Sequence, residues 1–200
     1  MKLPEHIFFT GVPGSHWSAI AQDMETISGF NTSDHATNRD YSPGTYTGHR
    51  GAYFGEGMEF SAKIEHVRYS DLTTFINEPW SEPGGTKILK SHEWAYKLPL
   101  IKKLFPESWT MLVYRPDMAS YAWWHEAGGF NIKYPNYASY KDSVGMLGEI
   151  TKQNQAILDY GHQNNVKWSP YTTAWLRDTF DCPSCVARKQ PTDILVTIIK

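Results

Sequence analysis

The chain has 200 residues, a formal net charge of -2, 40% hydrophobic residues and 20% charged residues, which is typical of one soluble globular domain and excludes a disordered chain. The charge does not favour non-specific binding to nucleic acid, and no apolar run reaches the roughly 20 residues of a membrane-spanning helix. Because the N-terminus also lacks the apolar region of a signal peptide, we expect a single cytoplasmic domain over residues 1–200 without nucleic-acid or membrane partners.

The N-terminal segment 7–18 has the pattern of a buried strand, a tight turn and the start of a helix. Ile7–Phe9 are bulky and apolar, as a strand buried on both faces requires. Two glycines and a proline within residues 11–14 mark the turn, and Ser15 or Ser18 would cap the helix. Such a turn directs backbone N–H groups toward one point, which favours an anion such as phosphate. An ordinary strand-to-helix turn is the alternative, and without Gly-Lys-Ser/Thr the loop is not a Walker A sequence.

Apolar residues at helical spacing predict a helix over residues 17–30, directly after the loop. Residues 31–60 have little periodicity, and a segment of about 30 residues is too long for a mere connector in a compact domain. Within it we interpret residues 46–55 as a substrate-facing loop, because glycines alternate there with basic and aromatic residues. A surface excursion without chemical role is the alternative. The candidate substrate-binding residues of this loop are His49, Arg50, Tyr53 and Phe54.

The rest of the chain alternates between helix and strand patterns. Helices are expected over 72–77, 98–105, 116–127, 139–162 and 173–180, and strands over 86–89, 109–114 and 193–199. The β-branched run at 193–199 favours a central strand. The alternation predicts an α/β fold of three layers, with a mostly parallel central sheet and helices on both faces. Ligands in such folds bind at the carboxyl ends of the strands.

The two cysteines lie close together, in Cys182-Pro183-Ser184-Cys185. A structural zinc site needs two such pairs, so one pair gives little support for a metal. We interpret Cys182 and Cys185 as two reduced thiols in a turn. A redox pair and half of an intermolecular metal site are the alternatives.

Polar residues follow the predicted strands at their carboxyl ends. The first strand runs into the loop at 11–18, the second into Lys90-Ser91-His92, and the third into Arg115 and a helix that carries Ser120. Parallel strands bring these ends to one edge of the sheet. The resulting cleft would suit a ligand with two separated anionic groups.

These three segments, in this order, resemble the motifs of the sulfotransferases that use 3′-phosphoadenosine 5′-phosphosulfate (PAPS). Residues 11–18 resemble the loop that holds the 5′-phosphosulfate, 86–99 is similar to the Lys-Thr-His segment, and 112–121 looks like the 3′-phosphate motif. The resemblance covers about residues 7–127. It implies a P-loop NTPase-like sulfotransferase architecture, PAPS as donor, adenosine 3′,5′-bisphosphate as product, and no required metal.

The resemblance also implies roles for individual residues. His92 corresponds to the general base and Lys90 to the residue that stabilises the leaving phosphate, while Trp124 would wall the acceptor pocket. Read without the resemblance, His92 is a strand-end histidine satisfied by a backbone partner and Lys90 a solvated charge. The residues that would hold the donor are Gly11, Val12, Pro13, Gly14, Ser15, His16, Trp17, Ser18, Arg115 and Ser120.

Some positions depart from the family pattern. Gly14 stands where the family has a basic residue, and His16 replaces a glycine. Ser120 follows Arg115 at shorter spacing than usual, so Tyr121 competes with it for the 3′-phosphate. An ion pair with a carboxylate is the alternative role of Arg115.

The expected function is sulfuryl transfer from PAPS to a hydroxyl or amine of a small-molecule or carbohydrate acceptor. Two alternatives stay open. One is another P-loop kinase or hydrolase, and the other is a non-catalytic module of the same fold that binds a nucleotide.

Overall fold

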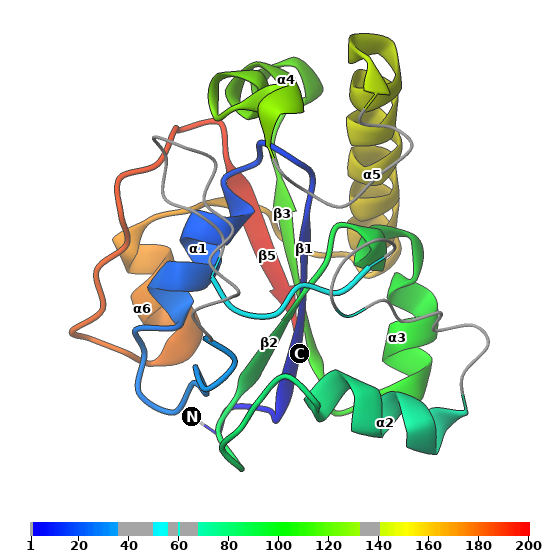
Figure 1. Cartoon of the computed structure of the whole chain (residues 1–200). Helices are drawn as coiled ribbons and strands as arrows, with labels where there is room; N and C mark the ends of the chain where they lie inside the picture. Colours follow the sequence, from blue (N-terminus) through cyan, green and yellow to red (C-terminus); the bar gives the residue numbers. More distant parts are fainter. Residues whose placement is uncertain (1, 36–49, 56–59, 61–67, 133–140) are drawn as a thin grey trace.

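The computed structural model describes residues 2–35, 50–55, 60, 68–132 and 141–200. Among them lies an open sheet of five strands in the order β2-β1-β3-β5-β4 (Figure 1). The strands are β1 (His6–Gly11), β2 (Lys87–Lys90), β3 (Trp109–Tyr114), β4 (Ser169–Pro170) and β5 (Leu195–Ile199). The expected α/β class is confirmed.

The sheet is mixed, so the prediction of a mostly parallel sheet is wrong. β1 pairs in parallel with β2 and β3, whereas β5 runs antiparallel to both β3 and β4. The cause lies in the path before β5. Residues 182–193 return to the carboxyl edge of the parallel strands, where Asp193 meets Arg115, and the chain therefore enters β5 from that edge.

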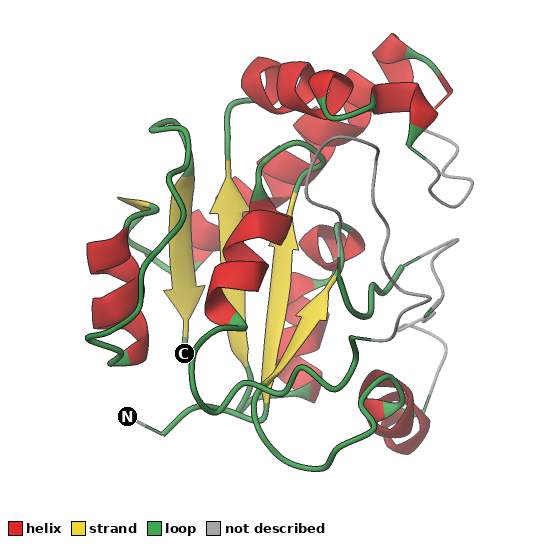
Figure 2. Cartoon of the chain, turned by 60° about the vertical axis from the view of Figure 1, so that its left-hand side comes forward, coloured by secondary structure: helices red, strands yellow, loops and turns green. Residues whose placement is uncertain are grey.

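Helices lie on both faces of the sheet (Figures 1 and 2). One face is covered by α1 and α6, the other by α3 and α5 with α2 beyond them, and α4 lies over the carboxyl edge. Two short 3₁₀ helices, η2 and η3, follow β2 and α4. The bounds are α1 (Trp17–Met24), α2 (Tyr69–Asn77), η2 (Glu93–Tyr96), α3 (Leu98–Leu104), α4 (Asp117–Glu126), η3 (Gly129–Asn131), α5 (Ser143–Gln163) and α6 (Thr173–Phe180).

Each central strand contributes to two cores, one on each face. Phe8 and Leu112 are fully buried with the residues of α3 and α5, while Ile7, Phe9 and Met111 are fully buried with those of α1 and α6. Successive side chains of a strand point to opposite faces. A strand covered on both faces must therefore be apolar throughout, which is why β1 and β3 read as continuous apolar runs.

The positions at which the helices begin and end depend on their terminal residues and differ from those that the apolar periodicity predicts. The helix expected over 17–30 ends at Met24 and continues as turns, while α5 begins after Asp142, whose Oδ1 accepts a hydrogen bond of 2.7 Å from the Gly145 N–H. Every helix of the described ranges is too short or too polar to cross a bilayer.

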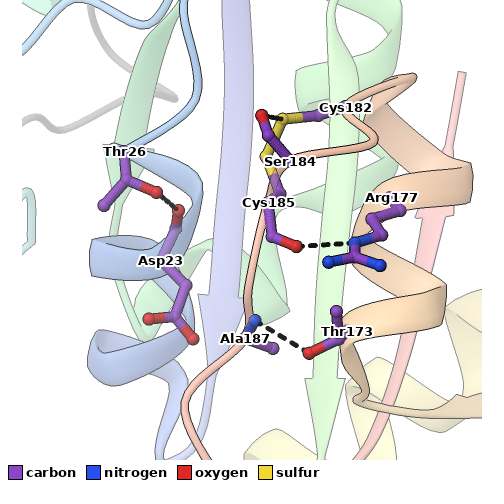
Figure 3. The surroundings of a disulfide bond; sticks show 8 residues. All are labelled: Asp23, Thr26, Thr173, Arg177, Cys182, Ser184, Cys185 and Ala187. Atoms are coloured by element: carbon purple, nitrogen blue, oxygen red, sulfur yellow. Dashed lines mark hydrogen bonds between the residues drawn. A yellow bond between two sulfur atoms is a disulfide. The ribbon is translucent and has the colours of Figure 1, made fainter.

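The two cysteines are joined in a disulfide (Figure 3), so the interpretation of Cys182 and Cys185 as reduced thiols is wrong. The turn after α6 places their Cα atoms 5.5 Å apart, within the range that a disulfide spans. The Cys185 N–H donates to the carbonyl of Cys182 across the same turn at 3.1 Å.

Candidate functional site

The β1–α1 loop leaves several hydrogen-bond donors unused. The Ser15 N–H bonds the Val12 carbonyl at 3.1 Å, and the helical ladder starts only with Ala19, which bonds the His16 carbonyl at 3.0 Å. Within the described residues, the N–H groups of His16 and Ser18 make no hydrogen bond. The Ser15 hydroxyl is also buried without a partner, and no side chain caps α1. Unused donors at a helix N-terminus are the chemistry that binds an anion.

Gly14 cannot be replaced by a residue with a side chain without moving α4. Its φ is 79°, and a Cβ there would lie 1.9 Å from the Ser120 carbonyl oxygen. Arg115 donates from Nη1 to the Gly14 carbonyl at 3.2 Å. The close approach of the loop to α4 thus explains why no basic side chain stands at this position.

His16 fastens the loop to α4 and carries little charge. It takes a left-handed conformation with φ 63°, and its ring stacks on Trp123 with centroids 4.3 Å apart. Burial, together with the nearby Arg115, lowers the pKa of His16 to about 4. The imidazole is therefore neutral at pH 7 and does not replace the missing loop cation.

His92 is held against the end of β1 in one tautomer. Its Nδ1 must donate to the Gly11 carbonyl, because a carbonyl only accepts, and the lone pair is thereby assigned to Nε2. No hydrogen bond of Nε2 occurs among the described residues. The half-buried ring packs on Trp17 at 4.3 Å between centroids, and burial lowers the pKa of His92 to about 4. The imidazole is therefore neutral and Nε2 carries a lone pair that can accept a proton, but a pKa of about 4 makes it a weaker base than a histidine that titrates near neutral pH.

Lys90 is neither a solvated charge nor directed at the loop. Its side chain is 1% exposed, and Nζ lies 2.8 Å from Glu25 Oε1, 2.8 Å from the Arg50 carbonyl and 3.9 Å from Asp34 Oδ2. The ammonium also faces the Tyr53 ring at 5.3 Å. Lys90 is thus the cation of a buried polar cluster.

No pattern in the sequence predicts this cluster, which consists of Lys90, Glu25, Asp34 and His35. Burial by itself would raise the pKa of Glu25, but Lys90 and His35 outweigh it and the pKa is lowered, whereas burial raises the pKa of Asp34. His35 Nε2 lies 3.2 Å from Glu25 Oε2. Gly51, with φ 79°, is required here because a Cβ would lie 2.2 Å from Asp34 Oδ2. Residues 31–35 and 50–52 have no periodicity that could have predicted such contacts.

Arg115 forms the ion pair that the sequence left open. Nε lies 3.1 Å from both carboxylate oxygens of Asp193, and the side chain is buried. The Ser120 hydroxyl donates to the Arg115 carbonyl at 3.2 Å and is fully buried, so it is already satisfied. No hydrogen bond of Nη2 of Arg115 occurs among the described residues, which leaves donors for a ligand.

The candidate substrate-binding residues are mostly core residues. Tyr53, Phe54 and Trp124 are exposed by only 4%, 1% and 4%. Arg50 is exposed, and its carbonyl is used by Lys90. His49 lies outside the described residues.

Two surface pockets are lined by residues outside the β1–α1 loop. One of about 270 Å³ lies at the opposite edge of the sheet and includes His6 and Phe105. The other, of about 530 Å³, is lined by Tyr121 of α4 and by residues of α5. In the described part of the chain, no three metal-binding side chains are grouped as an ion site.

The structure therefore brings the loop, His92 and Arg115 together at the carboxyl ends of β1, β2 and β3, and it directs Lys90 elsewhere. This arrangement defines an α/β protein with an uncapped helix N-terminus beside a neutral histidine. Comparison with protein-family models, curated proteins and solved structures finds no match to the chain.

Proposed function

We propose that the chain is a cytoplasmic sulfotransferase of P-loop-like architecture that transfers a sulfuryl group from PAPS to a hydroxyl or amine of a small-molecule or carbohydrate acceptor. One observation carries the proposal. The hydrogen bond from His92 to the Gly11 carbonyl places an oriented proton acceptor beside a loop with unused donors. An anion-binding group next to a base is what sulfuryl transfer to a hydroxyl requires.

Each residue then has a defined task. The N–H groups of His16 and Ser18 and the Ser15 hydroxyl would bind the 5′-phosphate, and Nη2 of Arg115 would bind the 3′-phosphate. His92 Nε2 accepts the proton of the acceptor hydroxyl while its oxygen forms the new bond to sulfur. The bond from sulfur to the phosphate oxygen breaks, and the bisphosphate leaves. Lys90 is assigned the role of positioning the end of β2, which precedes His92, rather than of contacting a phosphate. Its ion pair with Glu25 would have to open before its ammonium group could reach a phosphate.

A non-catalytic nucleotide-binding module is the second candidate. The observation in its favour is that both cations of the strand ends are already paired, Lys90 with Glu25 and Arg115 with Asp193. A protein that only binds a nucleotide needs no cation to stabilise a leaving group.

Calorimetry with adenosine 3′,5′-bisphosphate, and separately with ATP and Mg²⁺, tests the proposal. We expect the bisphosphate to bind and ATP with Mg²⁺ to bind more weakly. The variant His92→Ala should keep the affinity and lose bisphosphate release from PAPS in the presence of p-nitrophenol and glucosamine as probe acceptors. His162→Ala, an exposed histidine on α5, is the matched control. Absence of bisphosphate binding refutes the proposal, and binding without turnover by the unmodified protein supports the non-catalytic module.

The ion pair of Arg115 offers a second test of the same site. Asp193→Asn removes the carboxylate that competes for the guanidinium, so the bisphosphate should bind roughly three- to tenfold more tightly, which is about 1 kcal/mol. Arg115→Gln should weaken binding instead. Unchanged affinity in both variants would exclude Arg115 from the nucleotide site.

A further inference from the structure

The turn that follows α6 is held by hydrogen bonds that do not involve sulfur (Figure 3). The Cys182 N–H donates to the Arg177 carbonyl at 3.1 Å, and the Arg177 Nε donates to the Cys185 carbonyl at 2.7 Å. Two residues further on, the Ala187 N–H donates to the Thr173 hydroxyl at 3.1 Å. None of these contacts uses a sulfur atom, so we expect them to keep the two cysteines close to each other after reduction as well.

The disulfide is poorly placed to act as a structural staple. Its cysteines are three positions apart in the sequence, and a disulfide stabilises a fold chiefly by restricting the unfolded chain, with less effect for shorter loops. Here the closed loop is a single turn that the backbone already holds. Stability of the fold therefore gives little reason for the two thiols.

The segment after the turn is anchored independently of the disulfide. Arg188 Nε lies 3.0 Å from Asp23 Oδ1, and the Arg188 N–H donates to Asp23 Oδ2 at 2.9 Å. The Tyr171 hydroxyl donates to the same carboxylate at 2.9 Å. The buried Asp23 of α1 thus holds Arg188 in place, so reduction of the disulfide is compatible with an unchanged fold.

The two cysteines differ in their access to solvent. Cys182 is half-buried between exposed neighbours, whereas Cys185 is 7% exposed and belongs to the core beneath α1 and α6. The Ser184 hydroxyl lies 3.9 Å from Cys182 Sγ. An attacking thiol reaches the more accessible of two sulfurs, and the other departs as the leaving thiolate.

We propose that Cys182 and Cys185 form a reversible thiol–disulfide exchange site whose substrate is a dithiol. A thiolate of the dithiol attacks Cys182 Sγ, the disulfide breaks, and Cys185 leaves as a thiolate and takes up a proton. The second thiol of the dithiol then attacks the dithiol sulfur that is bonded to Cys182, a disulfide forms within the dithiol, and Cys182 leaves as a thiolate and takes up a proton. Two electrons and two protons pass to the chain, the dithiol becomes a disulfide, and an oxidant of the disulfide class reverses the exchange. This inference does not depend on sulfotransferase activity.

The test is equilibration of the whole chain in buffers of reduced and oxidised glutathione, followed by alkylation with N-ethylmaleimide and mass spectrometry. We expect one reversible transition between no alkylated thiol and two alkylated thiols. Dithiothreitol, as the probe dithiol, should reduce the folded chain while its near-ultraviolet circular dichroism spectrum is retained. Oxidised glutathione should form a mixed disulfide readily on Cys182 in Cys185→Ser and much more slowly on Cys185 in Cys182→Ser.

Three outcomes would overturn the proposal. Loss of the near-ultraviolet spectrum on reduction would show a structural staple. Two alkylated thiols in every glutathione buffer would show that the disulfide does not form in solution. Stoichiometric zinc retained by the reduced chain after exposure to Zn²⁺ would show a metal site. The bisphosphate titration is run separately, so failure of the sulfotransferase proposal leaves this test unaffected.

Discussion

Single residues determine how closely the β1–α1 loop approaches α4. Two features require glycine at position 14. Its φ is positive, and its backbone lies so close to Ser120 that there is no room for a Cβ. His16 occupies a left-handed conformation that glycine adopts at no steric cost, and its stacking on Trp123 offsets part of the strain. The glycine at position 14 therefore has a steric explanation, whereas the histidine at position 16 is accommodated despite its backbone conformation through its stacking on Trp123.

The substitution Gly14→Ala should be markedly more destabilising than Gly84→Ala. Both glycines have positive φ, 79° and 75°, which costs a side chain roughly 1–2 kcal/mol, but a Cβ at Gly84 would meet nothing within 4 Å. The clash with Ser120 should add about 1–3 kcal/mol at Gly14. Urea unfolding of both variants measures the difference, and equal losses would contradict the close packing of the loop on α4.

At the scale of elements, the buried cluster joins β2 to two neighbouring segments near the N-terminus that are remote from it in sequence. Glu25 follows α1, Asp34 lies in the segment beyond it, and Lys90 ends β2. The Lys90 side chain therefore links the segments around Glu25 and Asp34 to the strand that precedes His92. This link requires that the positive charge of Lys90 and the carboxylates around it remain paired, since a buried charge without a partner is strongly unfavourable.

Lys90→Met should lower the free energy of unfolding by about 3–5 kcal/mol, because Glu25 and Asp34 would lose the lysine ammonium and keep only His35 as a basic neighbour. The double variant Lys90→Met/Glu25→Gln should recover part of this loss. Chemical denaturation measures both, and Lys103→Met, an exposed lysine of α3, should change stability by less than about 0.5 kcal/mol. A loss below about 1 kcal/mol in Lys90→Met would show that the cluster is solvated.

Elements with continuous apolar runs could be predicted from the sequence, and those defined by long-range contacts could not. The bulky residues of β1 and β3 require burial on both faces, so the parallel centre of the sheet follows from composition. The direction of β5 depends on where residues 182–193 lead the chain, which the β-branched run does not encode. At the site, the positions of His92 and Arg115 after strands make them predictable, whereas Glu25 at the end of α1 and Asp34 in the segment beyond it lie after no predicted strand.

At the scale of the whole molecule, the half-buried histidines His16 and His92 make stability depend on pH. The folded pKa values of His16 and His92, about 4, lie below the ordinary value of 6.5. The unfolded chain therefore binds protons first as the pH falls. Their contribution to stability is complete above about pH 6.5 and is lost progressively toward pH 4.

The free energy of unfolding should accordingly fall between pH 7 and pH 5. His92→Gln removes one titrating ring and should reduce this fall, whereas His162→Gln, at an exposed position, should leave it unchanged. Urea titrations at both pH values provide the measurement. A steeper fall in His92→Gln would contradict the direction given for the pKa of His92.

The pairing of β1 also has a consequence for the rate at which the chain folds. Ile7 lies between Ile88 on one side and Trp109 on the other, and β3 in turn pairs Thr110 with Ile199. None of these partners is a sequence neighbour. The entropy cost of closing each long intervening segment therefore comes before the favourable contacts between the paired strands can form. The central strands should therefore stay unpaired through much of the folding reaction, which would place the chain among slow folders that expose strand edges to other molecules until β5 is in place.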